Sequence, residues 1–99
     1  MNDLTSLPGF LRYNDRREHD CDMGEQWIFR FPNNYGASVI NGPMFYTDKD
    51  HPYELGVVFF DGDKFNLVYP KEIGPDVLGY LTFDDVAATL KKIEELPYA

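Results

Sequence analysis

Residues 53 to 69 read YELGVVFFDGDKFNLVY, and this stretch predicts two strands joined by a tight turn. In residues 53–60, every second side chain is apolar and lies on one face, and the other face also carries apolar residues. This pattern is typical of a central strand. Asp61-Gly62 predicts a type I′ hairpin turn, which needs positive φ at both central residues. Phe65 to Tyr69 alternates again before a proline. The stretch therefore predicts the centre of an antiparallel sheet.

A second pair of strands is predicted upstream, on either side of a group of turn-forming residues. Gln26 to Phe31 alternates and places three aromatic side chains on one face. Pro32 to Gly36 combines the residue types that fix φ or tolerate positive φ, so it predicts a turn. Ala37 to Ile40 then forms a short strand. We expect Tyr35 at the tip of this turn, where a plain hairpin does not need an aromatic ring.

The C-terminal segment, residues 82 to 96, predicts an α-helix. Thr82 is the expected N-cap, and Asp85 three residues later completes an aspartate version of the capping box. Acids precede bases along the segment, as the helix dipole favours. The apolar stripe consists of Val86, Ala87, Leu90 and Ile93. Pro97 ends the helix.

These elements predict an α+β fold, an antiparallel sheet of about four strands with one C-terminal α-helix packed on a face. We expect a single domain over residues 1–99, with the sheet in 26–70 and the helix in 82–96. Residues 1–25 show no clean periodicity, and most of the later part of this segment is charged. The segment is therefore expected to be an irregular or partly ordered N-terminal arm.

Composition limits the possible functions. The net charge of −8, from 17 acids and 9 bases, argues against direct binding of nucleic acid, which needs clustered Lys and Arg. It leaves two interpretations open: a solubilising surface, or attraction to a partner with a basic surface. No apolar run reaches the roughly 20 residues that span a bilayer. Cys21 is the only cysteine, which suits a reducing compartment, and no secretory signal is evident, so we expect the cytoplasm.

Motifs for metal binding and catalysis are weak. His19-Asp20-Cys21-Asp22 has three kinds of metal ligand, but zinc sites usually draw their ligands from separated elements. The acids near Asp61 lack the EF-hand spacing. No nucleotide-binding loop or nucleophile elbow is present. We therefore expect no cofactor, no metal and no catalysis, with a metal protein or enzyme using His19–Asp22 as a remaining alternative.

Exposed acids and loop aromatics are the candidate protein-binding residues. The acids are Asp20, Asp22, Asp48 and Asp50, and the aromatics are Tyr35, Phe45 and Tyr46. Tyrosine is enriched at protein interfaces. The same rings are also compatible with capping the core of a small sheet, and the sequence leaves both interpretations open.

The order of three segments resembles a family of small proteins encoded by tailed bacteriophages and prophages. The segments are FPNNYGASVINGP (31–43), YELGVV (53–58) and IGPDVLGYLTFDDV (73–86), and the resemblance covers about residues 26 to 96. Asn34 stands where a glycine is usual, so we expect a left-handed backbone at this asparagine. The resemblance implies a phage origin but supplies no catalytic residue.

The expected function is that of an acidic phage accessory protein in the cytoplasm of the bacterial host. It would bind and modulate or inhibit a host or phage protein with a basic surface, for example a defence or nucleic-acid enzyme. The first alternative is a small structural or assembly module that forms a homo-oligomer.

Overall fold

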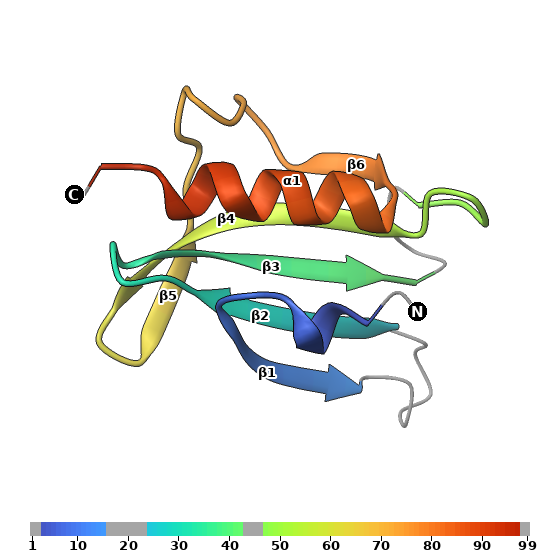
Figure 1. Cartoon of the computed structure of the whole chain (residues 1–99), viewed down its shortest axis with the longest axis horizontal. Helices are drawn as coiled ribbons and strands as arrows, with labels where there is room; N and C mark the ends of the chain where they lie inside the picture. The colour runs from blue at the N-terminus through green and yellow to red at the C-terminus, as the bar shows by residue number, and fades with distance from the viewer. Residues whose placement is uncertain (1–2, 16–23, 43–46, 98–99) are drawn as a thin grey trace.

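The computed structural model describes residues 3–15, 24–42 and 47–97 of the chain (Figure 1). It shows an α+β fold, an antiparallel sheet with one C-terminal helix packed on one face. The elements in chain order are η1 (Leu4–Ser6), β1 (Phe10–Asp15), β2 (Glu25–Arg30), β3 (Tyr35–Asn41), β4 (Tyr53–Asp61), β5 (Lys64–Leu67), β6 (Leu78–Leu81) and α1 (Phe83–Glu94).

The sheet has more strands than the sequence predicted. Five strands lie in the order β1-β2-β3-β4-β5, and β6 pairs with β4 as a sixth. The expectation of about four strands was therefore wrong. β6 is only four residues long, and its register against β4 is irregular between Tyr53 and Leu55. Such a short strand gives no clear alternation in the sequence.

Residues 1–25 were expected to form an irregular or partly ordered arm, and the described part of this segment contains a strand that the sequence did not predict. Leu4–Ser6 forms a 3-10 turn, and Phe10–Asp15 forms β1, which pairs with β2. A register shift between Phe10 and Arg12 interrupts the pairing, and only Phe10 and Asn14 of the strand are half-buried. The apolar alternation that marks a strand is therefore missing here.

The predicted hairpin between β4 and β5 is confirmed, but its turn type is different. Asp61 pairs with Lys64, so Gly62 and Asp63 are the two central residues. Gly62 has a φ of 65°, whereas Asp63 is not among the described residues with positive φ. Positive φ at the first central residue alone fits a type II′ turn, which places glycine there.

The N-terminus of α1 follows the prediction. Thr82 is the N-cap, and its Oγ1 accepts the Asp85 N–H at 3.1 Å while the Asp85 carboxylate accepts the Thr82 N–H at 3.0 Å. Both bonds satisfy N–H groups that a helix start leaves without partners. The helix ends at Glu94, slightly before the predicted end at residue 96.

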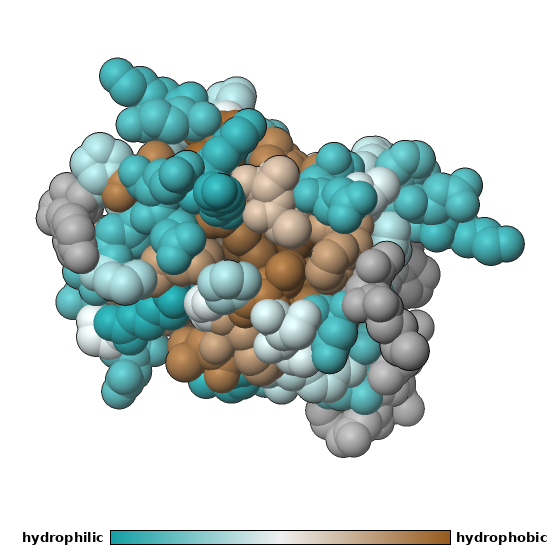
Figure 2. Space-filling view, viewed as in Figure 1, coloured by the Kyte–Doolittle hydropathy of each residue, from teal (hydrophilic) through white to brown (hydrophobic). Residues whose placement is uncertain are grey.

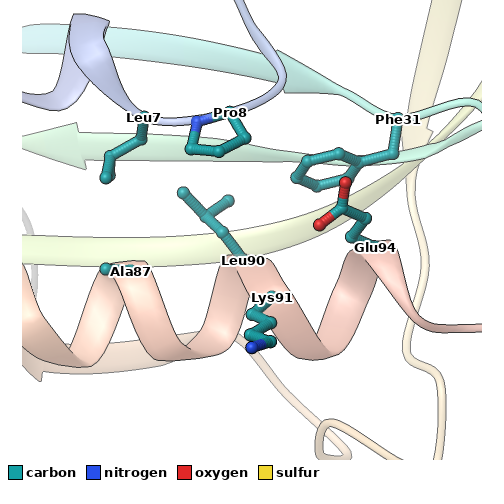
Figure 3. Close-up of a pocket in the computed structure, with 7 residues that line it drawn as sticks. All are labelled: Leu7, Pro8, Phe31, Ala87, Leu90, Lys91 and Glu94. Carbon is teal, nitrogen blue, oxygen red and sulfur yellow. The ribbon is translucent and has the colours of Figure 1, made fainter.

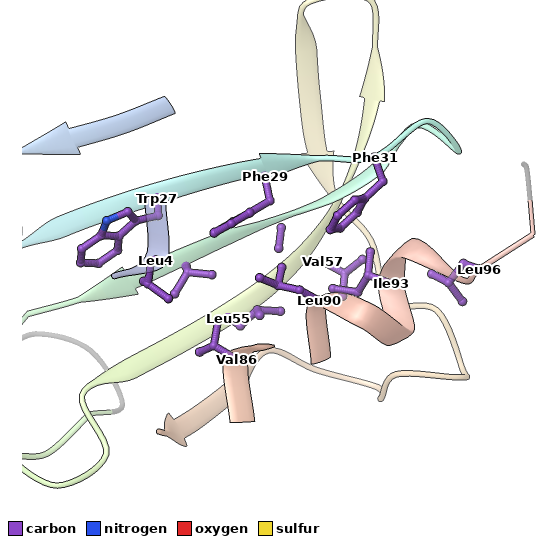
Figure 4. Close-up of a cluster of buried hydrophobic side chains, with 12 residues drawn as sticks. Leu4, Trp27, Phe29, Phe31, Leu55, Val57, Val86, Leu90, Ile93 and Leu96 are labelled. Atoms are coloured by element: carbon purple, nitrogen blue, oxygen red, sulfur yellow. The ribbon is translucent and has the colours of Figure 1, made fainter. Parts of the chain in front are cut away.

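The main core lies between α1 and the sheet (Figure 4). The predicted stripe residues Val86, Leu90 and Ile93 are buried there. Opposite them lie apolar side chains of the three central strands, namely Trp27, Phe29, Ala37, Val39, Leu55 and Val57, with Leu4, Phe31 and Leu96 completing the cluster. Val58 and Phe60 belong to a second, smaller cluster with Ile28. β4 is therefore apolar on both faces, because the side chains of each face belong to a different cluster.

Candidate functional site

The turn at residues 31–36 holds the C-terminal end of α1. The Asn33 side chain is buried, and its Nδ2 donates to the carbonyl oxygens of Ile93 at 3.0 Å, Glu94 at 3.2 Å and Leu96 at 3.0 Å. Its Oδ1 accepts the Tyr35 N–H at 3.0 Å. One side chain thus binds the helix end and shapes its own turn. The sequence predicted only the second role.

Two further residues of this turn are explained by backbone geometry. Asn34 has a φ of 71°, so the predicted left-handed asparagine is confirmed. A Cβ on Gly36 would lie 1.9 Å from the carbonyl oxygen of Phe29, which leaves no space for a side chain. The turn-forming residues are therefore required by the fold itself.

Tyr35 does not lie at an exposed tip. It is the first residue of β3 and is half-buried, and its ring packs against Phe59 with 5.2 Å between ring centroids. The ring also contacts the main core. Of the two interpretations left open for the candidate aromatics, this position fits capping of the core.

Asp48 and Asp50 lie together in the exposed loop before β4. The Asp48 carboxylate accepts the N–H groups of Asp50 at 3.0 Å and His51 at 2.7 Å, and it lies 3.0 Å from the His51 Nδ1. Desolvation raises the pKa of Asp48, but the hydrogen bonds and charge of His51 outweigh it and hold this pKa below its usual value. Asp48 therefore shapes its loop and stays ionised at neutral pH.

Other candidates fall outside the described residues. They are Asp20, Asp22, Phe45 and Tyr46, together with the alternative metal or enzyme site at His19–Asp22. Across residues 3–15, 24–42 and 47–97, no group of three or more His, Cys, Asp or Glu side chains is arranged to hold a metal ion. In the same part of the chain, no helix has the length and apolar character needed to cross a bilayer.

The fold brings acids from three segments to one end of the molecule. The loop before β4, the start of β2 and the N-terminus of α1 lie at the right in Figure 1, where β6 also ends. We call this region the acidic end and define it by Glu25, Asp48, Asp50, Asp84 and Asp85. Among these segments, Lys49 is the one Lys or Arg.

Electrostatic contacts link the segments of the acidic end. The backbone and side chain of Thr82 lower the pKa of Asp85, and the charge of His51 contributes in the same direction. Burial raises the pKa of Tyr53, and the charge of Glu25 adds to this effect. Glu25 also accepts the hydroxyl of Tyr13 at 2.7 Å. The loop therefore acts on α1, and β2 on the start of β4, through charge.

Tyr80 adds an exposed aromatic ring beside these acids. It lies in β6, two residues before the helix cap, and 54% of its surface is exposed. Its φ of 56° is rare for a bulky residue and costs roughly 1–2 kcal/mol. Nothing in the residue type predicts this backbone, and Tyr80 was not among the candidate residues. The irregular pairing of β6 with β4 produces it.

An apolar groove lies on the helix side of the molecule, between the N-terminal segment and α1 (Figure 3). It has a volume of about 330 Å³, and Leu7, Pro8, Phe31, Ala87 and Leu90 line it together with Lys91 and Glu94. Figure 2 shows hydrophobic surface in the middle of this face, with hydrophilic residues around it. The short side chain of Ala87 leaves part of this space unfilled.

Comparisons with known proteins give no relative: no protein-family model, no curated protein and no solved structure matches the chain. The acidic end combines ionised carboxylates with a presented tyrosine ring. This combination suits the binding of a basic protein surface, because complementary charge guides association and tyrosine provides contact area.

Proposed function

We propose that this chain is a binding protein whose acidic end recognises a basic surface on another protein. The observation that carries the proposal is the convergence of acids from three segments at the end of the molecule where β6, which contains the exposed Tyr80, leads into α1. In the described part of the chain, no Lys or Arg ion pair neutralises Asp50, Asp84 or Asp85. These carboxylates are therefore accessible to a basic partner.

The strained backbone of Tyr80 gives this surface a second supporting feature. A tyrosine held in a left-handed conformation costs folding free energy, and such strain is frequent at functional sites. Here it accompanies a ring that is mostly exposed and lies beside the N-terminus of α1. A surface that only solubilises the protein has no need of this ring. The feature therefore favours partner binding over solubility alone.

The proposed biological setting follows from the family resemblance. The ordered motifs of residues 31–43, 53–58 and 73–86 support a phage accessory protein that acts in the cytoplasm of the bacterial host. The proposed partner is a host or phage protein with a basic groove, and a defence or nucleic-acid enzyme is the favoured class. A net charge of −8 is suited to occupying the groove that such an enzyme offers to phosphates.

A pull-down from host lysate at low and at physiological salt tests this function. The test variant is the double substitution Asp50→Asn and Asp84→Asn, and the matched control is Glu94→Gln and Glu95→Gln at the opposite end of α1. Both variants change the net charge by the same amount. We expect one dominant partner that is weakened by higher salt and by the test variant, and retained by the control. Capture of the partner that does not change with salt concentration contradicts the proposal. Equal loss of capture in the test and control variants also contradicts it.

A second candidate function is homo-oligomeric assembly through β1. Among the described strands β1 pairs only with β2, and Leu11 in it is 52% exposed. An edge strand is a template for pairing with another chain. Light scattering after size exclusion tests this alternative: a stable oligomer that Leu11→Lys converts to a monomer supports it, and a wild-type monomer at high concentration excludes it.

A further inference from the structure

A second hollow lies on the face of the sheet that α1 does not cover. Leu55 and Val57 point into the main core, so Gly56 and Val58 between and beside them face the other side. The hollow has a volume of about 240 Å³. It is lined by Gln26, Ser38, Ile40, Glu54, Gly56, Val58, Phe65, Leu67 and Val77. None of these residues belongs to the acidic end.

Gly56 lies at the base of one side of the hollow. A Cβ on this residue would lie 2.6 Å from Cδ2 of Leu67 and 3.5 Å from Cγ1 of Val77. These two side chains therefore lie directly over the glycine and form a wall. Together with Val58 and Phe65, they give the hollow an apolar side against which a flat group can pack.

Polar side chains form a row that leads to this hollow across neighbouring strands. Nδ2 of Asn14 donates to Oε1 of Gln26 at 3.0 Å, and Nε2 of Gln26 donates to Oγ of Ser38 at 2.9 Å. Ser38 pairs with Gly56, and Ile40, two residues further along β3, pairs with Glu54. Glu54 is therefore the diagonal neighbour of Ser38 on β4. The row is thus continuous from β1 to β3, and Glu54 is the next polar residue beyond it on β4.

The row is interrupted between Ser38 and Glu54. Within the part of the chain that the structure describes, the Ser38 hydroxyl makes no hydrogen bond besides the one it accepts from Gln26, and Glu54 makes no side-chain hydrogen bond or ion pair. Both groups are half-buried and line the same hollow. A ligand group placed between them would continue the row, donating to the Ser38 Oγ and to the Glu54 carboxylate.

We propose that this hollow binds a small primary amine that has a flat apolar body. The ammonium group would donate to Glu54 and Ser38, and the body would pack on Phe65, Leu67 and Val58. A carboxylate ligand is disfavoured because Glu54 would repel it. The volume limits the ligand to fragment size, for which a dissociation constant on the order of 0.1–1 mM is expected.

An NMR titration of the ¹⁵N-labelled full chain tests this site. The probe is 2-phenylethylamine, and 2-phenylethanol and 3-phenylpropanoate are the neutral and anionic analogues of similar shape. We expect saturable shifts at the amides of Ser38, Gly56 and Val77 with the amine, and clearly weaker binding of both analogues.

Two charge-matched variants complete the test. Glu54→Gln keeps the shape of the side chain and should weaken amine binding about five- to tenfold, because it removes a charge-assisted hydrogen bond. Glu95→Gln, on the C-terminal cap of α1, should leave binding unchanged. The absence of saturable shifts, equal affinity for amine and alcohol, or an unaffected Glu54→Gln variant would each overturn the proposal.

Discussion

The Asn33 side chain binds the carbonyl oxygen of Leu96, 63 residues later in the chain, at 3.0 Å. The same amide also reaches the carbonyls of Ile93 and Glu94, so it takes the place of a C-terminal cap for α1. The turn before β3 and the end of the helix are therefore one structural unit.

Replacing Asn33 should destabilise the whole fold. Asn33→Ala removes the side-chain partner of the Glu94 and Leu96 carbonyls and of the Tyr35 N–H, so we expect a loss of about 2–3 kcal/mol in the free energy of unfolding. Urea denaturation measures it. Asn66→Ala on the exposed strand β5 is the control and should change stability by less than about 0.5 kcal/mol. Equal effects of the two substitutions would show that the buried amide has no special role.

Asn34 should respond to substitution through its backbone alone. Its φ of 71° suits glycine and asparagine, so Asn34→Gly should be neutral within about 0.5 kcal/mol. Asn34→Ala should cost about 1 kcal/mol, because a Cβ without a local hydrogen-bonding group is disfavoured in this region. Thermal unfolding of the two variants compares them directly. A stable alanine variant would contradict the left-handed conformation.

Tyr80→Gly should separate stability from binding. Glycine relieves the strained φ, so we expect the variant to be at least as stable as the wild type, by up to about 1 kcal/mol. The loss of the exposed ring should at the same time weaken capture of the partner that the acidic end binds. Urea denaturation measures the stability of the variant, and a pull-down with the same preparation measures its capture of the partner. A higher free energy of unfolding with unchanged capture of the partner would show that Tyr80 is not part of the proposed interface.

Ala87→Leu should stabilise the protein by filling the groove between the N-terminal segment and α1. The larger side chain keeps the helix propensity high and gains apolar contacts with Leu7 and Pro8, so we expect about 0.5–1 kcal/mol. Ala88→Leu, at an exposed position of the same helix, is the matched control and should have a smaller effect. Destabilisation by Ala87→Leu alone would mean that the groove is too tight for the added atoms.

The capping carboxylate of Asp85 should make α1 sensitive to acid. Its pKa in the folded protein lies below the ordinary 3.8, because it accepts hydrogen bonds from Thr82. The resulting stability is present above the pKa of the unfolded chain and is lost as the pH falls through the folded value. Asp85→Asn should therefore be less stable than the wild type at pH 7, and the difference should shrink below about pH 4. A pH-independent difference would exclude this linkage.

The amino-acid sequence by itself determined the features that depend on neighbouring residues. Alternation in residues 53–69 predicted the β4–β5 hairpin, and the spacing from Thr82 to Ile93 predicted the cap and the buried stripe of α1. These signals are local, because a strand has a period of two and a helix a period of 3.6. The left-handed backbone at Asn34 was instead expected from the family resemblance, in which a glycine is usual at this position.

Tertiary structure alone decided the features that depend on distant partners. β1 and β6 are strands because β2 and β4 supply their hydrogen bonds, although neither shows a clear alternating pattern. The sequence predicted Asn33 only as a turn residue, and its bond to the helix end depends on α1 lying beside the turn. The acidic end and the row from Asn14 to Ser38 also join residues from separate strands and loops. Long-range contacts of this kind leave no periodic signal, because a side chain does not encode which distant backbone it will meet.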